Sequence, residues 1–425
     1  MKPFLCTSLA CILLIACSSM AFAAEADHAI VDAKAQASPR LRSALSEAWS
    51  RHPSAFSAER KLAAARARAT AAGRPIYNPA LEVAADNEGE DHMRTVGLSQ
   101  TLDLFGKRRA RQAVGTAELA RAEAEFTLQA NTFARDWLTG WTHLLSARRQ
   151  LELGEQRVAL AERLVELAER QRLVGDISVP ERDLVLLARD EALAEQASLA
   201  ADAASAEEAF SRVGGSLDSL ASLPIMEAPP ADMPTVGASP VEDLPEFRIA
   251  LADANVAQQR IAVATRDRRP DPTVSVRGGQ INNGPATGNI VGISVSIPLF
   301  LRNSYGAEVV AANADAASAD ADVKRLKLEL QAHVDSTART YAAVHAAWLA
   351  WHRSRGTDLA ARSRDLERLW QAGELSTVDY VLQIKQTLDT ALAGAALDGR
   401  VWQSYFEYLY AIGQLDEWSG IGVAQ

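Results

Sequence analysis

The chain of 425 residues has few cysteines, few histidines and no long apolar run beyond its N-terminal segment. Its three cysteines are Cys6, Cys11 and Cys17, so the sequence that follows can form neither a disulfide nor a thiolate metal cluster. No later apolar run reaches the roughly 18 residues that a membrane-spanning helix requires. The sequence therefore excludes a disulfide-stabilised domain and predicts no transmembrane helix.

Motifs of the common enzyme classes are missing as well. There is no Gly-rich phosphate loop, no G-x-S-x-G elbow and no H-E-x-x-H. A formal net charge of −10 gives no basic footprint for nucleic acid. His345 and His352 could share one face of a helix, but no carboxylate cluster accompanies them, and we interpret them as structural or solvated. The sequence predicts a protein that is not an enzyme and has no cofactor or metal site.

Residues 1–23 have the features of an export signal. Lys2 precedes an apolar run at 4–16, and a small-residue cleavage site follows at 21–23. A second processing site overlaps the first, because residues 14–17 (LIAC) resemble a bacterial lipoprotein box in which Cys17 carries the lipid. We expect cleavage after Ala23 in preference to lipidation of Cys17.

A short stretch occurs twice, as VGLSQTLDLF at residues 96–105 and as VGISVSIPLF at 291–300. Both copies alternate large apolar residues with small or polar ones, which is the period of a strand with two different faces. About ten such residues also match a tilted strand that crosses a bilayer, although an amphipathic strand in a soluble sheet has the same pattern.

Each copy follows a partner strand, at residues 79–87 and 272–280, so the sequence predicts two β-hairpins, over 79–105 and 272–300. Four strands cannot close a barrel alone, and an open sheet leaves unpaired edges. We therefore expect the strands to pair with other copies of the chain.

The rest of the sequence is predicted to be helical, and the order of its elements repeats. A helix at 39–73 with a break near Pro53 precedes the first hairpin, and a helix of roughly 100 Å follows it from Gly106 to Gln171. Helix, hairpin, long helix, turn and helix then recur, with the second long helix at about 305–371, which indicates an internal duplication. The predicted segments are the signal at 1–23, a first repeat at 24–213, a Pro-rich linker at 214–243, a second repeat at 244–413 and a tail at 414–425.

Over nearly all of this length, the chain resembles the TolC-like outer-membrane efflux protein family. The resemblance rests on the duplicated order, on the strand ends VGLSQTLDLFGKRRA and VGISVSIPLFLRNSYGA, and on the turns LVGDIS and QAGELSTVDYV. It implies a mainly α fold with a small β part, in which long coiled helical hairpins accompany two β-hairpins. It also implies a homotrimer that forms a twelve-stranded outer-membrane β-barrel, continued by a periplasmic α-helical tunnel.

The implied function is the exit channel of a tripartite efflux system in a Gram-negative bacterium. Its partners would be a periplasmic adaptor, an inner-membrane resistance-nodulation-division pump and outer-membrane lipid. Residues 101–110 resemble the branch that serves cobalt–zinc–cadmium efflux, although Phe105 stands where that branch usually has a small residue. Divalent heavy metals are thus the first expected substrates, and drugs or small organic molecules the alternative. A periplasmic adaptor or a structural coiled-coil protein is the alternative of another class.

The resemblance also assigns roles to the two helix turns. It places them at the periplasmic tip, where the adaptor docks; the residues concerned are Val174, Gly175, Asp176 and Ser178, and Gly373, Glu374 and Ser376. Asp379 matches an acidic residue that lines the family's periplasmic constriction, and Glu181 corresponds to it through the internal repeat. Leu382 stands where a second acidic residue often follows. An acid near a helix N-terminus can equally serve only the helix dipole.

Overall fold

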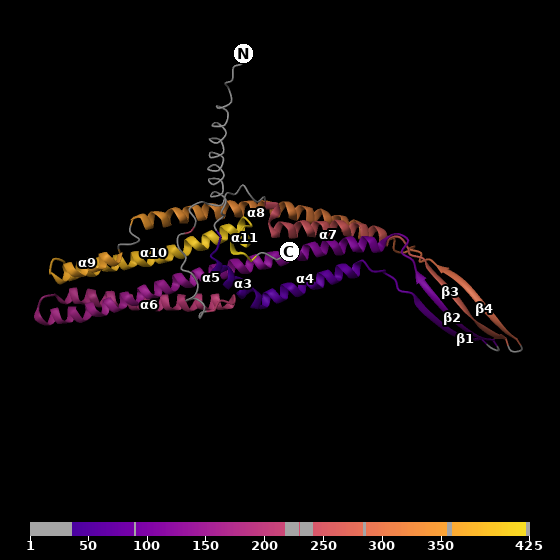
Figure 1. Ribbon diagram of the computed structural model, residues 1–425, viewed down its shortest axis with the longest axis horizontal. Helices are drawn as coiled ribbons and strands as arrows, with labels where there is room; N and C mark the ends of the chain where they lie inside the picture. The colour runs from indigo at the N-terminus through magenta and orange to yellow at the C-terminus, as the bar shows by residue number, and fades with distance from the viewer. Residues whose placement is uncertain are drawn as a thin grey trace, which may run out of the picture.

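The computed structural model describes residues 36–88, 91–216, 229, 241–283, 286–354 and 359–421. This part of the chain is mostly helical and carries one small antiparallel sheet at one end, as Figure 1 shows. The predicted class, mainly α with a small β part, is confirmed. The export signal, Cys17 and most of the predicted linker lie outside the described residues.

The helices are long, and several begin with proline in the first turn, where its missing N–H costs nothing. The longest has 68 residues and a length of about 100 Å. The predicted helix at 305–371 includes residues 355–358, which are not described. The helices are α3 (Pro39–Arg51), α4 (Pro53–Ala72), α5 (Lys107–Val174), α6 (Val179–Arg212), α7 (Pro245–Asp267), α8 (Gly306–Ser354), α9 (Leu359–Gln371), α10 (Thr377–Ala411) and α11 (Leu415–Ser419), with a 3-10 turn at Val241–Asp243.

The sheet is a four-stranded antiparallel meander in the order β1-β2-β3-β4. Its strands are β1 (Ala80–Glu88), β2 (Asp91–Thr101), β3 (Thr273–Asn283) and β4 (Thr287–Ser296). The connectors are shorter than predicted, because residues 91–94 pair with β3. β2 and β4 also end before Phe105 and Phe300. The chain leaves β2 at Asp103, which caps the next helix, and Pro298 has no N–H to extend the ladder of β4.

The two faces of the sheet differ in chemistry. Leu81, Leu98, Val276 and Ile293 are direct cross-strand partners and form one apolar row across all four strands. All four are exposed, with 49–75% of their surface accessible to solvent. The opposite face carries mainly small and polar residues such as Ser99, because successive side chains alternate between faces.

The helices next to the sheet follow the same order as the strands. α4 packs on α5, α5 on α7, and α7 on α8, while α4 leads into β1, β2 into α5, α7 into β3 and β4 into α8. One wall therefore runs through both parts, with α4 and β1 along one edge and α8 and β4 along the other (Figure 1).

The core lies in the middle of the helical part, where the two repeats pack on each other. Trp137, Trp141 and Trp348 are buried there, and Trp402 packs against the same cluster. A smaller cluster nearer the helix turns joins α5, α6, α9 and α10. None of the described helices is both long and apolar enough to cross a membrane.

Candidate functional site

The two predicted turns lie at the end of the molecule opposite the sheet (Figure 1). Both use a glycine in the left-handed region, with φ of 87° at Gly175 and 75° at Gly373. The next residue closes each turn in the same way, since Asp176 N–H donates to Gln171 O and Glu374 N–H donates to Leu369 O, both at 2.9 Å. A Cβ would meet no atom within 4 Å at either glycine, so only the backbone conformation opposes substitution there.

The two predicted gate carboxylates both lie in the first turn of their own helices and contact the serine at the N-cap. Glu181 accepts hydrogen bonds from the backbone N–H and the hydroxyl of Ser178, each at 2.7 Å, and these bonds lower the pKa of Glu181 below its ordinary value. Ser376 donates its hydroxyl to Asp379 Oδ2 at 2.7 Å and accepts the Asp379 N–H at 3.1 Å. Glu181 thus completes a capping box at the start of α6, whereas Ser376 caps α10 and the Asp379 carboxylate only accepts its hydroxyl. The role of both acids at a constriction stays a prediction.

The two turns present different surfaces. Leu173 and Val174 in the first turn are 84% and 72% exposed. Ile177 and Leu375, at matching positions of the two turns, both pack against the cluster that joins α5, α6, α9 and α10. The second turn has Gln371 and Ala372 where the first has Leu173 and Val174, so it lacks the exposed apolar pair. An apolar pair this exposed is suited to contact with another protein, so the first turn is the stronger docking candidate of the two.

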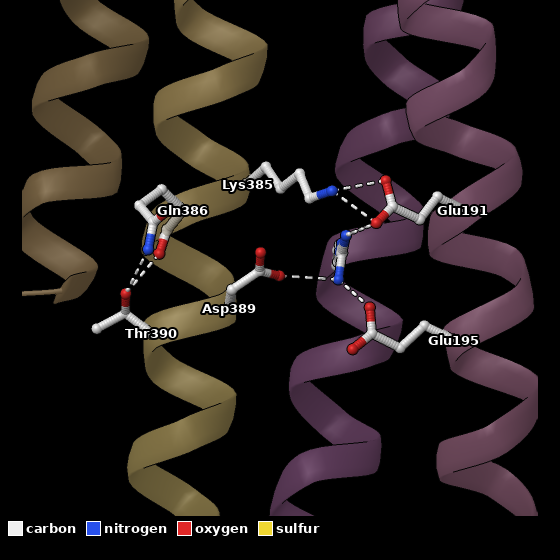
Figure 2. A network of polar contacts seen from close by, with 7 residues as sticks. Glu191, Glu195, Lys385, Gln386, Asp389 and Thr390 are labelled. Atoms are coloured by element: carbon white, nitrogen blue, oxygen red, sulfur yellow. Dashed lines mark hydrogen bonds and ion pairs between the residues drawn. The ribbon is translucent and has the colours of Figure 1, made fainter.

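A polar network that the sequence analysis missed joins the two repeats some turns below these tips (Figure 2). Arg157 on α5 has a side chain only 6% exposed, and it pairs with Glu195 of α6, with Asp389 of α10 at 3.0 Å and with Glu191 of α6 at 3.8 Å. Lys385 of α10 reaches Glu191 at 2.6 Å. We call these five residues the seam network.

The sequence did contain one signal for this network. Arg157 stands between Leu153 and Leu160 at the three- and four-residue spacing that buries one side of a helix, so an arginine there has to find partners. Which carboxylates meet it depends on how α10 docks on α5 and α6, and no local pattern encodes that docking.

Another buried ionic contact lies where the sheet meets the helices. Lys107 Nζ is 2.9 Å from Asp271 Oδ2, with side chains 8% and 3% exposed, and Tyr77 donates its hydroxyl to the same oxygen at 2.8 Å. The other oxygen, Oδ1, is buried without a hydrogen-bond partner among the described residues. This triad fixes the segments leading into β1 and β3 to the first turn of α5.

Aromatic residues just beyond the strand ends pack locally around this junction. The ring centroids of Phe300 and Tyr305 are 5.0 Å apart, and the guanidinium of Arg269 lies 5.3 Å from the ring of Phe105. All of these rings lie beyond the same end of the strands, where β2 and β4 lead into helices.

His345 and His352, two of the three histidines of α8, do share a face, with Trp348 between their rings. His352 Nε2 lies 3.0 Å from Asp398 Oδ1, which also accepts the indole N–H of Trp348 at 2.8 Å. His345 is buried, and burial lowers its pKa. Within the described ranges, no group of three or more His, Cys, Asp or Glu side chains is arranged to hold a metal ion.

Comparison with known proteins finds relatives in metal resistance. No family model matches the chain. The chain is 26% identical over 267 residues to the nickel-cobalt-cadmium resistance protein NccC of Alcaligenes xylosoxydans xylosoxydans, covering 60% of each protein. It is 24% identical over 269 residues to the cobalt-zinc-cadmium resistance protein CzcC of Cupriavidus metallidurans, covering 60% of this chain and 62% of CzcC. The alignment thus spans about three fifths of either relative.

Solved structures match over a greater length. The outer membrane protein VceC of Vibrio cholerae superposes with a TM-score of 0.69 at 19% identity, over 88% of this chain and 96% of VceC. The CmeC outer membrane channel of Campylobacter jejuni gives a TM-score of 0.71 at 13% identity, over 88% of this chain and 86% of CmeC. The chain therefore has the fold of the TolC-like outer-membrane channels, and the family resemblance that its sequence shows is confirmed.

Proposed function

We propose that the chain is the outer-membrane channel of a tripartite efflux system, in the outer membrane of a Gram-negative bacterium and reaching into the periplasm. It would be a passive duct without catalysis, receiving substrate from an inner-membrane resistance-nodulation-division pump and a periplasmic adaptor. The observation that carries the proposal is the sheet, whose exposed apolar face continues a helical wall in the same strand and helix order. An exposed apolar sheet of this size is stable in lipid and prone to aggregation in water.

The free edges of the wall support a homotrimer. β1 and α4 end one side, β4 and α8 the other, and the two sides belong to successive repeats of one duplicated pattern. Three copies would join edge to edge into a closed barrel of twelve strands, continued by a helical tunnel, so that every strand is paired. Strands of 9–11 residues span roughly 30–37 Å, which matches a tilted crossing of the hydrocarbon core.

Membrane extraction and crosslinking test this assembly. The protein should stay with the outer-membrane fraction after washing with salt and alkali, and it should leave only with detergent. Crosslinking in native membranes should then give a species of three chains. A chain released without detergent, or a stable monomer with a closed barrel, would contradict the proposal.

Divalent heavy-metal cations are the substrates that we propose first, because NccC and CzcC are resistance proteins for nickel, cobalt, zinc and cadmium. Phe105, at a position usually small in that branch, keeps drugs or small organic molecules as the second candidate. Deletion of the gene should lower tolerance to nickel, cobalt, zinc or cadmium and leave tolerance to dyes and antibiotics unchanged. The reverse result would favour the second candidate.

The turns and the capping acids complete the proposal. We assign adaptor docking to the two turns, and cation attraction at the periplasmic constriction to Asp379 and, more weakly, Glu181. Three chains would bring several carboxylates towards one axis, and such a ring favours cations.

Conductance in a planar bilayer tests the gate. D379A should weaken block by divalent cations added on the periplasmic side, and E181A should do so less. Because Asp379 also accepts a hydrogen bond from Ser376, S376A is the matched control, since it removes the cap and keeps the charge. Equal effects of D379A and S376A, or no effect of D379A, would reject a role of this carboxylate in the constriction.

A further inference from the structure

An excess of arginine surrounds the end of the sheet that joins the helices. Three stretches that leave or enter strands there contain six exposed arginines, in a chain whose formal net charge is −10. We call them the arginine collar: Arg108, Arg109 and Arg111 after β2, Arg268 and Arg269 before β3, and Arg302 after β4.

The arginines of the collar are not paired with carboxylates among the described residues. None of its arginines forms an ion pair with another residue in the described ranges; Arg268 donates to the carbonyl of Ser304 at 3.2 Å, and Arg269 lies over Phe105. Of the acids beside the collar, Asp103 accepts the backbone N–H groups of Lys107 and Arg108 at 2.8 Å each. Asp271 is buried with Lys107 and Tyr77. Asp267 and Glu308 are the other carboxylates of these stretches. Six exposed arginines thus lie at this end of the sheet without an ion-pair partner in the described ranges, and they outnumber the acids beside them.

Apolar side chains lead directly into the collar. Leu102 and Leu104 continue the alternation of β2 on its apolar face and are 39% and 63% exposed. Leu299 and Leu301 follow β4 in the same sequence alternation and are 74% and 86% exposed. The apolar stripes of the sheet therefore run past the strand ends and stop at the arginines, so arginine follows exposed leucine along both stretches.

We infer that the arginine collar binds the phosphate headgroups of anionic phospholipids at the membrane surface where the helices begin. Apolar surface followed by basic side chains matches the order of acyl chain and headgroup in a leaflet. A guanidinium also suits phosphate, because its planar fork donates two parallel hydrogen bonds. The continuity with the apolar stripes favours a lipid over a free anion, because a soluble anion has no acyl chain that could contact the leucines.

The inference rests on the proposed outer-membrane location, and lipid titration tests it separately. The full-length protein, delipidated in a zwitterionic detergent, is titrated with fluorescent phosphatidylglycerol and with phosphatidylethanolamine of the same acyl chains. We expect phosphatidylglycerol to bind at least about 100-fold tighter, with this preference falling as sodium chloride rises from 50 to 500 mM.

A triple variant, R108Q/R109Q/R111Q, should lose most of that preference. A basic residue near an anionic surface contributes about fivefold, so three arginines correspond to a loss of about 100-fold for phosphatidylglycerol and little change for phosphatidylethanolamine. The matched control is R163Q/R170Q/R172Q, which removes three exposed arginines from the other end of the same helix and should bind like wild type.

Each other outcome overturns the inference. Equal binding of the two lipids by wild type, equal losses in both triple variants, or inorganic phosphate displacing phosphatidylglycerol at equal concentration would exclude a lipid site at the collar. If R108Q/R109Q/R111Q fails to assemble, the lipid preference of the wild-type protein and its salt dependence still test the inference. A protein that needs no detergent would reject the proposed function, whereas one that needs detergent but ignores lipid charge would reject only this inference.

Discussion

Neutralising the carboxylates of the seam network should loosen the contact between the repeats more than removing its central arginine. Arg157 is 6% exposed, whereas Glu195 and Asp389 are each 39% exposed and Glu191 is 52% exposed. If Arg157 is removed, water can solvate the carboxylates that remain. If Glu195 and Asp389 are neutralised, a buried cation loses its closest partners.

The difference in burial between Arg157 and its carboxylate partners determines how much stability each variant should lose. Removing one partner of a fully buried ion pair costs about 3–5 kcal/mol. Glu191 would still lie 3.8 Å from Arg157 in E195Q/D389N. We therefore expect this double variant to lower the local free energy of opening by about 2–3 kcal/mol. R157M places an unbranched apolar side chain among Leu160, Leu164 and their neighbours, and we expect a cost of about 1 kcal/mol or less.

Hydrogen exchange of the assembled protein measures these costs, because the opening free energy of each protected amide is obtained locally. The informative amides are those of residues 381–392 in α10, which carry Lys385 and Asp389. R148M is the matched control, since Arg148 pairs with Glu207 at half-exposed positions and should change little. A larger loss of protection in R157M than in E195Q/D389N would refute the reasoning from burial.

Further predictions follow from the turns, the sheet junction and the seam. A bulky residue at Gly175 or Gly373 forces a left-handed backbone on a side chain, costs about 1–2 kcal/mol locally and should abolish export, measured as metal tolerance, while crosslinked trimers remain in the membrane. K107M leaves the Asp271 carboxylate buried with one hydrogen-bond donor and should lower the melting temperature of the detergent-solubilised protein by several degrees, while K107M/D271N recovers part of the loss. The hydrogen bond from Lys385 lowers the pKa of Glu191. The contribution of this pair to stability is therefore fully present above the ordinary glutamate pKa of about 4.3 and is lost as the pH falls through the lower pKa of the folded state. Hydrogen exchange should show this loss as reduced protection of α10.

Much of the architecture was predictable from local patterns. Alternation in residues 96–105 and 291–300 predicts the paired strands, and the absence of proline between Gly106 and Gln171 predicts one long helix. The ends of the strands were harder to predict, because Asp103 fits the alternating pattern of a strand. Only the structure shows that its carboxylate accepts the first N–H groups of α5.

The functional features were predictable only where the chain itself fixes them. Gly175 and Gly373 are recognisable as turn residues because the left-handed conformation favours glycine. The seam network and the junction of Lys107 with Asp271 join residues far apart in sequence, and their pairing follows from how the helices dock. Whether Asp379 lines a constriction depends in addition on neighbouring copies of the chain.

The uninterrupted length of α5 limits which insertions and deletions the sequence can accept. Because α5 is one continuous helix of 68 residues, inserting one residue shifts the part of the helix that follows by about 1.5 Å and rotates it by about 100°. Such a step upstream of Arg157 would turn its side chain away from Asp389 on α10. Insertions of about seven residues nearly restore the phase, because two turns of helix then separate the flanks. A longer or shorter version should therefore arise by matched seven-residue steps in neighbouring helices, with single-residue insertions confined to the turns and connectors.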